Sequence, residues 1–257
     1  MSSHPFTCPV IQRIWGSPEA ILLFFAGGAA EFAALKAVDW LFFTNNLPAA
    51  PIDRFFETVR FAQRVFFGTP TQAAATIATI NRIHRHVEAA RDLPIPEWAY
   101  RDVLFLLIDY GERAHAIIYG PMPAVEQLAH FEAILALGHA MHLRGLPTTY
   151  AAYQAQRHQQ LLDDYAPSAL MEHLFASYRT AIGPWRYRLL RLIQASLLPA
   201  ELRLVVGLRP NGLVDGVLRC YRYLPGGGNK LRWLHSLLLP RQVAQRVRTL
   251  AQGVGAR

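Results

Sequence analysis

Apolar residues recur at helical spacing along nearly the whole chain, and the alternation of apolar and polar residues that marks strands is hard to find. Segments containing proline or glycine interrupt this pattern, as is typical of helix ends. The interruptions fall at Pro18, 47–51, 68–70, 93–96, 120–123, 145–147, Pro167 and 225–228. These interruptions predict an all-α protein of about eight helices joined by short loops.

The local chemistry around residue 70 predicts one helix in detail. Thr69 is followed by Pro70 and Gln72, which is the pattern of a capping residue, a proline at the first helical position and a capping-box partner. A helix from about Pro70 to Arg91 is therefore expected.

The composition favours one large domain rather than two. The chain has 257 residues, of which 52% are hydrophobic and 17% charged, so it can bury a core large enough to enclose a prosthetic group. We expect a helical domain over residues 1–240 and a basic tail over 241–257. Two cysteines, Cys8 and Cys220, cannot form a disulfide framework or a cysteine-rich zinc site, which favours a reducing compartment.

The sequence predicts a cytoplasmic protein. The first thirty residues lack the pattern of a signal peptide. The most apolar stretch begins at Ala20, but Glu31, Lys36 and Asp39 interrupt it before it is long enough to span a bilayer. We therefore expect a buried helix there.

Positive charge gathers towards the C-terminus. Residues 186–257 hold 13 basic residues against Glu201 and Asp215, whereas the rest of the chain holds 13 basic against 16 acidic. Basic residues interleaved with leucine, tryptophan and tyrosine suit a helix on an anionic membrane surface. A solvated helix face is the other interpretation. No nucleic-acid recognition motif accompanies the charge, so a nucleic-acid partner is not expected.

A candidate anion-binding face lies in the segment 53–67. Arg54 and Thr58 are four residues apart and project from one side of a helix among Phe55, Phe61 and Phe66. An arginine and a hydroxyl on an aromatic face could bind a carboxylate, a propionate or an oxygen-derived ligand. The alternative is an exposed arginine and a threonine bonded back to its own helix.

Two histidines lie near the end of the expected helix 70–91. His84 and His86 are two residues apart, so they point to different sides and cannot chelate one metal ion together. His84 falls on the apolar stripe with Ile77 and Ile80, and a buried imidazole there could coordinate iron. A hydrogen-bonded core histidine is the simpler interpretation.

A second metal hypothesis comes from Glu112 and His115, whose Glu-x-x-His spacing occurs in di-iron helical bundles. Such a site needs a second pair of this kind, which the sequence lacks, although Glu126, Glu132 and His139 could supply ligands. A P-loop, a nucleophile elbow and a dinucleotide-binding glycine motif are also absent from the sequence.

Taken together, these motifs resemble the MpaB and rubber oxygenase (latex clearing protein) family. The resemblance extends in order from about Trp15 to Pro240. Its motifs are Arg54-x-x-x-Thr58, Phe67-Gly68-Thr69, Ile83-His84-x-x-Val87, Tyr110-Gly-Glu-Arg113, His142-Leu-Arg-Gly-Leu-Pro147-Thr148 and Leu198-Pro199-x-x-Leu202-Arg203. No single motif is specific, and their common order carries the resemblance.

The resemblance implies a single globin-like helical domain that encloses a b-type haem. It implies that His84 is the axial iron ligand and that Arg54 and Thr58 line the haem edge. Arg60 could pair with a propionate, and Phe61 could line the cleft. With dioxygen as co-substrate, such a protein is expected to be an oxidoreductase, an oxygenase of a hydrophobic small molecule or polymer that is unsaturated or isoprenoid-like.

The chain departs from the family pattern at the residue before Thr58. Rubber-cleaving members have a lysine there that can cap the iron, whereas this chain has Glu57, which could instead accept a proton. Upstream, the stretch Leu35-Lys36-Ala37-Val38-Asp39 stands where many relatives have a His-Pro pair. Glu31, in an otherwise apolar helix, is a candidate catalytic base, with a surface glutamate as the alternative. Two other functions stay open: a non-haem iron enzyme using Glu112, and a non-catalytic carrier of haem or lipid.

Overall fold

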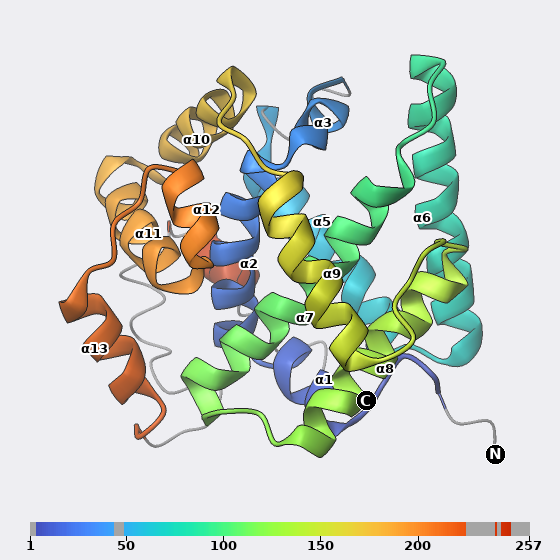
Figure 1. Ribbon diagram of the computed structural model, residues 1–257, viewed down its shortest axis with the longest axis horizontal. Helices are drawn as coiled ribbons and strands as arrows, with labels where there is room; N and C mark the ends of the chain where they lie inside the picture. Colours follow the sequence, from blue (N-terminus) through green and yellow to red (C-terminus); the bar gives the residue numbers. More distant parts are fainter. Residues whose placement is uncertain (1–3, 44–48, 225–239, 241–242, 248–257) are drawn as a thin grey trace.

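The computed structural model describes residues 4–43, 49–224, 240 and 243–247 (Figure 1). No strand occurs among them, apart from an isolated bridge between Leu35 and Tyr165. The helices are α1 (Pro9–Trp15), α2 (Pro18–Ala34), the 3-10 helix η1 (Lys36–Val38), α3 (Asp39–Phe43), α5 (Pro51–Phe67), α6 (Pro70–Arg91), α7 (Glu97–Tyr119), α8 (Ala124–Ala140), α9 (Tyr150–Asp163), α10 (Ala169–Ile182), α11 (Pro184–Leu197), α12 (Ala200–Val205) and α13 (Gly212–Tyr221). The all-α fold is confirmed.

The structure has more helices than the sequence predicted. Twelve α-helices lie in the described residues between Pro9 and Tyr221, against about eight expected. One additional break lies between α2 and α3, at η1. The other three lie after residue 167: Gly183 with a φ of 84° separates α10 from α11, Pro199 precedes α12, and a further break separates α12 from α13. Pro184 occupies the first turn of α11, where its missing N–H costs nothing.

Helices α2 and α7 form the centre of the fold, and α2 runs through the middle of the view in Figure 1. They approach closely at Gly27, where an added Cβ would lie 2.1 Å from the Tyr110 ring. Helix α11 packs on another side of α2. The N-terminal part of the chain therefore supplies the central helix, around which later helices are arranged.

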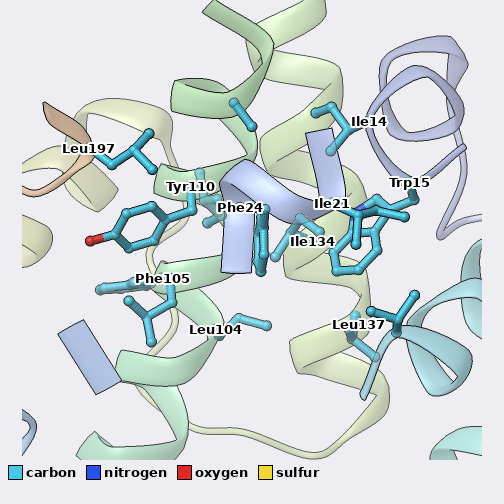
Figure 2. Close-up of a cluster of buried hydrophobic side chains, with 14 of the residues drawn as sticks. Ile14, Trp15, Ile21, Phe24, Leu104, Phe105, Tyr110, Ile134, Leu137 and Leu197 are labelled. Atoms are coloured by element: carbon cyan, nitrogen blue, oxygen red, sulfur yellow. The ribbon is translucent and has the colours of Figure 1, made fainter. Parts of the chain in front are cut away.

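Aromatic and aliphatic side chains are mixed in the core around α2, as Figure 2 shows. The Trp15 ring lies 5.1 Å from the Phe24 ring and 5.2 Å from the Phe66 ring, between centroids. Leu104 and Ile134 extend the same cluster along α7 and α8. These contacts fix α5, through Phe66, against α1 and α2.

The predicted helix start at residue 69 is confirmed. The Thr69 side chain accepts a hydrogen bond from the Gln72 backbone N–H at 3.2 Å, and the Gln72 side chain accepts one from the Thr69 N–H at 2.9 Å. This capping box holds the first turn of α6 directly after α5. The chain reversal at 68–69 places the two helices side by side.

Part of the expected tail packs on the domain. Val243 and Val247 are buried against Phe56 of α5, and the Arg246 guanidinium lies 4.0 Å from the Phe56 ring centroid. The expected boundary at 240/241 adjoins residues 241–242, which lie outside the described residues, so it stays a prediction. None of the helices in the described ranges is both long and apolar enough to cross a membrane.

Candidate functional site

One face of α5 carries the residues of the Arg54 motif. Glu57 and Thr58 are three and four residues after Arg54, and Phe61 is four and three residues after them, so all four share a side of the helix. Arg54 Nη1 lies 3.2 Å from Glu57 Oε2, and Thr58 Oγ1 donates to the Arg54 carbonyl at 2.9 Å. Phe56, Val59 and Phe66, on the other side of α5, are buried.

His84 lies on α6, beside the N-terminal part of α7. Its imidazole is half-buried, and its ring meets the edge of the Tyr100 ring with 5.1 Å between centroids. The Nδ1 atom is buried and has no hydrogen-bond partner. Burial leaves this nitrogen without a hydrogen-bond partner among the described residues, which is costly for a polar atom.

The electrostatic surroundings keep His84 neutral. Burial lowers the pKa of the imidazole, and the nearby positive charge of Arg54 lowers it further, while Glu88 opposes the shift. Glu88 itself accepts hydrogen bonds from the Ile95 N–H at 2.9 Å and the Tyr100 hydroxyl at 3.2 Å. A neutral imidazole is the form that binds a metal ion. The structure thus brings Arg54 and His84 together across the α5–α6 pair.

The apolar stripe of α6 around His84 is only partly covered by protein. Ala73, Thr76 and Ile77 are the buried residues of this helix, all in its first half. Further along, Ile80, Ile83 and Val87 are half-buried. A haem requires an imidazole for its iron, apolar contacts for its ring and a cation for its propionates. The His84 imidazole, the partly covered apolar stripe and Arg54 are residues of these three kinds.

The other predicted residues of this region differ in exposure. Glu57 has 53% of its side chain exposed, Thr58 and Arg60 are also exposed, and Phe61 is half-buried. His86 is exposed, as its position off the apolar stripe indicated. The back-bonded Thr58 matches the simpler of the two interpretations that its sequence left open.

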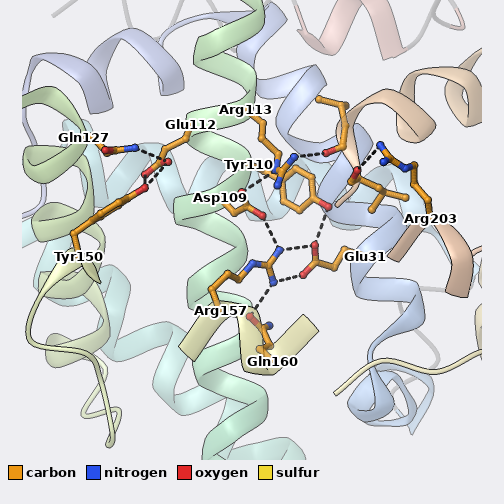
Figure 3. Close-up of polar contacts among 12 residues, drawn as sticks. Glu31, Asp109, Tyr110, Glu112, Arg113, Gln127, Tyr150, Arg157, Gln160 and Arg203 are labelled. Atoms are coloured by element: carbon orange, nitrogen blue, oxygen red, sulfur yellow. Dashed lines mark hydrogen bonds and ion pairs between the residues drawn. The ribbon is translucent and has the colours of Figure 1, made fainter. Parts of the chain in front are cut away.

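Glu31 lies in a different group of side chains, shown in Figure 3. It is fully buried on α2 rather than on a helix surface, and its carboxylate is paired with Arg157 through contacts of 2.5 and 2.8 Å. The hydroxyls of Tyr110, at 2.8 Å, and of Tyr165 also donate to it. No hydrogen bond or ion pair among the described residues joins Glu31 to Arg54 or His84. Its role as a base stays a prediction.

The same buried group contains a second carboxylate. Asp109 Oδ2 lies 2.7 Å from Arg157 Nη2, and Asp109 Oδ1 accepts from Arg113 Nε at 2.8 Å. Burial alone would raise the pKa of Asp109, but the two guanidinium groups outweigh it and hold the pKa below its ordinary value. Gln160 also accepts a hydrogen bond from Arg157, at 2.8 Å.

Arg157 is a residue that the sequence motifs did not indicate. The pattern that could have indicated it is a buried polar face on α9. This face consists of Tyr153, Arg157 and Gln160, which follow at helical spacing and are all buried. The spacing of apolar residues does not reveal such a face. Three polar residues of this kind at intervals of four and three would have pointed to an internal hydrogen-bond network.

The residues of the di-iron hypothesis have other partners. The Glu112 carboxylate accepts hydrogen bonds from Tyr150, at 2.8 Å, and Gln127, at 3.1 Å. Arg13 donates to His115 Nε2 at 2.9 Å, so Nδ1 carries the proton that bonds the Gly120 carbonyl at 3.0 Å. His139 is exposed on α8. In the part of the chain that the structure describes, no group of three or more such side chains is placed to hold a metal ion.

These observations define an all-helical protein with a neutral histidine whose buried Nδ1 has no hydrogen-bond partner among the described residues, and with an arginine near it on the adjacent helix. The catalytic-domain family described as ER-bound oxygenase mpaB/B'/Rubber oxygenase matches residues 13–224, and the chain belongs to this family. The match confirms the resemblance seen in the sequence motifs and makes the protein a member of an oxygenase family. None of the curated proteins and none of the solved structures matches the chain.

Proposed function

We propose that this protein is a haem-b-dependent oxygenase that uses dioxygen on a hydrophobic, unsaturated or isoprenoid-like substrate. The observation that carries the proposal is the His84 imidazole, which is neutral and half-buried, with a buried Nδ1 that has no partner. The membership in an oxygenase family supports it. Bound haem would supply the iron at which dioxygen is activated.

The residues around His84 have distinct tasks in this proposal. His84 would hold the iron, and its place on a long capped helix restricts the direction of the ring. Arg54 is the cation for a propionate or for negative charge that develops on oxygen. The Thr58 hydroxyl now donates to the Arg54 carbonyl, and its oxygen keeps lone pairs that can accept a hydrogen bond.

Glu57 is the proposed proton carrier. Its carboxylate is ion-paired with Arg54 and 53% exposed, so it can exchange protons with solvent. A carboxylate is a poorer iron cap than the lysine of the rubber-cleaving relatives. We therefore propose that the side of the site opposite His84 is open to dioxygen and substrate. Arg60 and Phe61 are proposed as the propionate partner and as part of the apolar lining.

The decisive experiment is the absorbance spectrum of protein reconstituted with haem. The wild type is expected to give a Soret band at about 400 nm. His84→Ala should lose or strongly shift this band, and His86→Ala, which removes an exposed imidazole two residues along, should keep it. A full, unshifted band in His84→Ala would show that the proposed ligand is wrong.

Oxygen consumption separates an oxygenase from a carrier. With haem bound and an isoprenoid substrate present, the proposal expects oxygen uptake, which Arg54→Met should reduce by about 10²-fold or more while haem stays bound. A haem spectrum without uptake on any apolar substrate tested would favour the carrier. Bound iron without a Soret band would favour the non-haem alternative.

A further inference from the structure

Helix α13 has an exposed apolar stripe. Leu213, Val217, Cys220 and Leu224 follow at intervals of four, three and four, so they lie on one side of the helix and its continuation. The side chains of Leu213, Val217 and Leu224 are 79%, 59% and 42% exposed. We call these four residues the α13 stripe.

The side of α13 about 100° around the helix from the stripe makes the contacts with the domain. Val214, Leu218 and Tyr221 are the partly covered apolar positions at the complementary spacing, and the helix packs against α7 and α11. None of the residues of α13 is fully buried. Figure 1 shows the helix at the periphery of the molecule, beyond α11. The α13 stripe is therefore not part of the core, and an exposed contiguous apolar surface of this kind marks an interaction site.

Positive charge flanks the stripe. Arg209 precedes α13, and Arg219 lies next to Cys220 in its last turn; both are exposed. Asp215 is the one acidic residue in the sequence from 202 to 257. A surface that combines exposed leucine and valine with arginines is complementary to a partner that is apolar inside and anionic outside.

We propose that the α13 stripe docks on the surface of an anionic phospholipid membrane, with Leu213 and Val217 inserted and Arg209 and Arg219 at the headgroups. Charge decides between the possible partners. A second copy of α13 would bring arginines against arginines, and residues 225–239 carry Lys230 and Arg232 with no acidic residue. The proposal goes beyond the proposed function, and the binding it describes does not depend on haem or on turnover.

The first test is sedimentation with large vesicles of phosphatidylcholine alone or of phosphatidylcholine mixed with phosphatidylserine. The wild type is expected to sediment with the mixed vesicles and not with the neutral ones. Leu213→Ser/Val217→Ser should weaken binding to the mixed vesicles by about tenfold or more. Val125→Ser, which changes a side chain 82% exposed on α8, is the matched control and should bind as the wild type does.

The second test asks whether the arginines contribute to binding and whether position 217 enters the bilayer. Arg209→Glu/Arg219→Glu should weaken binding by about tenfold or more, and Arg144→Glu, on a loop elsewhere, should leave it unchanged. In Val217→Trp, the fluorescence of the new tryptophan should shift to shorter wavelength on adding phosphatidylserine vesicles. Far-UV circular dichroism checks that each variant is folded.

Three results would overturn the proposal: no binding of the wild type to anionic vesicles, equal binding of the stripe variant and the wild type, or no shift for Val217→Trp when vesicles bind. Size-exclusion chromatography with light scattering tests whether the stripe binds a second copy of the chain instead. A concentration-dependent dimer that Leu213→Ser/Val217→Ser abolishes, without vesicle binding, would assign the stripe to a contact between two copies.

Discussion

Arg157 holds together the buried polar centre between α2, α7 and α9. Its guanidinium, 7% exposed, lies within hydrogen-bond distance of Glu31, Asp109 and Gln160 (Figure 3). Two carboxylates in an apolar core are tolerated only when a cation and hydrogen-bond donors compensate for the lost water. The position of Glu31 on the central helix thus depends on a residue 126 positions later.

We predict that Arg157→Leu destabilises the protein by about 3–5 kcal/mol, because it leaves Glu31 and Asp109 as uncompensated buried charges. The measurement is equilibrium urea unfolding followed by circular dichroism. Arg144→Leu, at an exposed arginine, is the control and should change the free energy of unfolding by less than about 0.5 kcal/mol. A similarly small effect of Arg157→Leu would mean that the ion pairs contribute little.

At the scale of single residues, the sequence could indicate His84 but not its surroundings. Its place on the apolar stripe of a helix follows from spacing alone, and the half-buried ring agrees with it. The contact with Tyr100 and the effect of Arg54 come from the packing of three helices, which spacing within one helix does not contain. For Glu31, periodicity could not separate a surface glutamate from one paired inside the core.

Among the elements, helices α2 and α7 approach closely because Gly27 has no side chain. An added Cβ at Gly27 would lie 2.1 and 2.5 Å from two atoms of the Tyr110 ring. At the adjacent Gly28 the contact from such a Cβ would be 3.8 Å, which is an ordinary distance. Tyr110 also donates to Glu31, so its ring cannot move without disturbing the buried polar centre.

We predict opposite effects of the same substitution at these two neighbouring glycines. Gly27→Ala should destabilise the protein by about 1–3 kcal/mol through overpacking. Gly28→Ala should be neutral or stabilise it by up to about 1 kcal/mol, because alanine favours the helix. Thermal unfolding of the two variants beside the wild type measures the difference, and equal melting temperatures for the two would contradict the close approach of α2 and α7.

Helix boundaries were predictable where capping chemistry is local. The start of α6 at Pro70 needs only Thr69, Pro70 and Gln72, which lie within one turn. The breaks at Gly183 and Pro199 were missed because the flanking segments share a continuous helical pattern of leucine and arginine. A proline at the first helical position starts a helix as readily as it ends one, and Pro184 and Pro199 mark such starts.

A pair of carboxyl groups affects the stability of the whole molecule. Asp102 on α7 is 1% exposed, and neither of its carboxyl oxygens receives a hydrogen bond from another donor among the described residues. Burial and the neighbouring Asp164 raise the pKa of Asp102 to about 8. The two side chains can form a hydrogen bond with each other only while one of them holds a proton.

The sign of the pH dependence follows from this proton. An unfolded aspartate releases its proton above about pH 4, whereas the folded chain keeps it until about pH 8. The folded state binds more protons over this interval, so its stability falls as the pH rises and stays low above it. The protonated Asp102 therefore stabilises the folded state at acidic pH, and this stabilisation is lost at weakly alkaline pH.

We predict that Asp102→Asn reduces this loss, because an amide can donate to Asp164 at every pH. At about pH 9 the variant should melt about 2–4 °C above the wild type, and the advantage should shrink towards about pH 5. Melting curves across this range test the prediction. A constant difference between variant and wild type at all pH values would contradict the shared proton.

The arrangement of the whole molecule was the part least accessible from the sequence. Periodicity predicts helices and their apolar faces, but it does not say that α2 lies at the centre or that α13 lies at the periphery. Those positions depend on contacts between residues far apart in the chain. The Gln194 side chain, for example, donates to the Ala26 carbonyl across 168 positions.

The central place of α2 has a consequence for synthesis on the ribosome. This helix emerges among the first, yet Arg157 and Gln194, which satisfy its buried carboxylate and one of its carbonyl groups, are translated more than a hundred codons later. Until then the nascent chain presents an apolar helix with an unneutralised glutamate, a state that invites aggregation. Chains truncated before Arg157 should accordingly depend on chaperones to stay in solution, and productive folding should await the synthesis of α9 and α11.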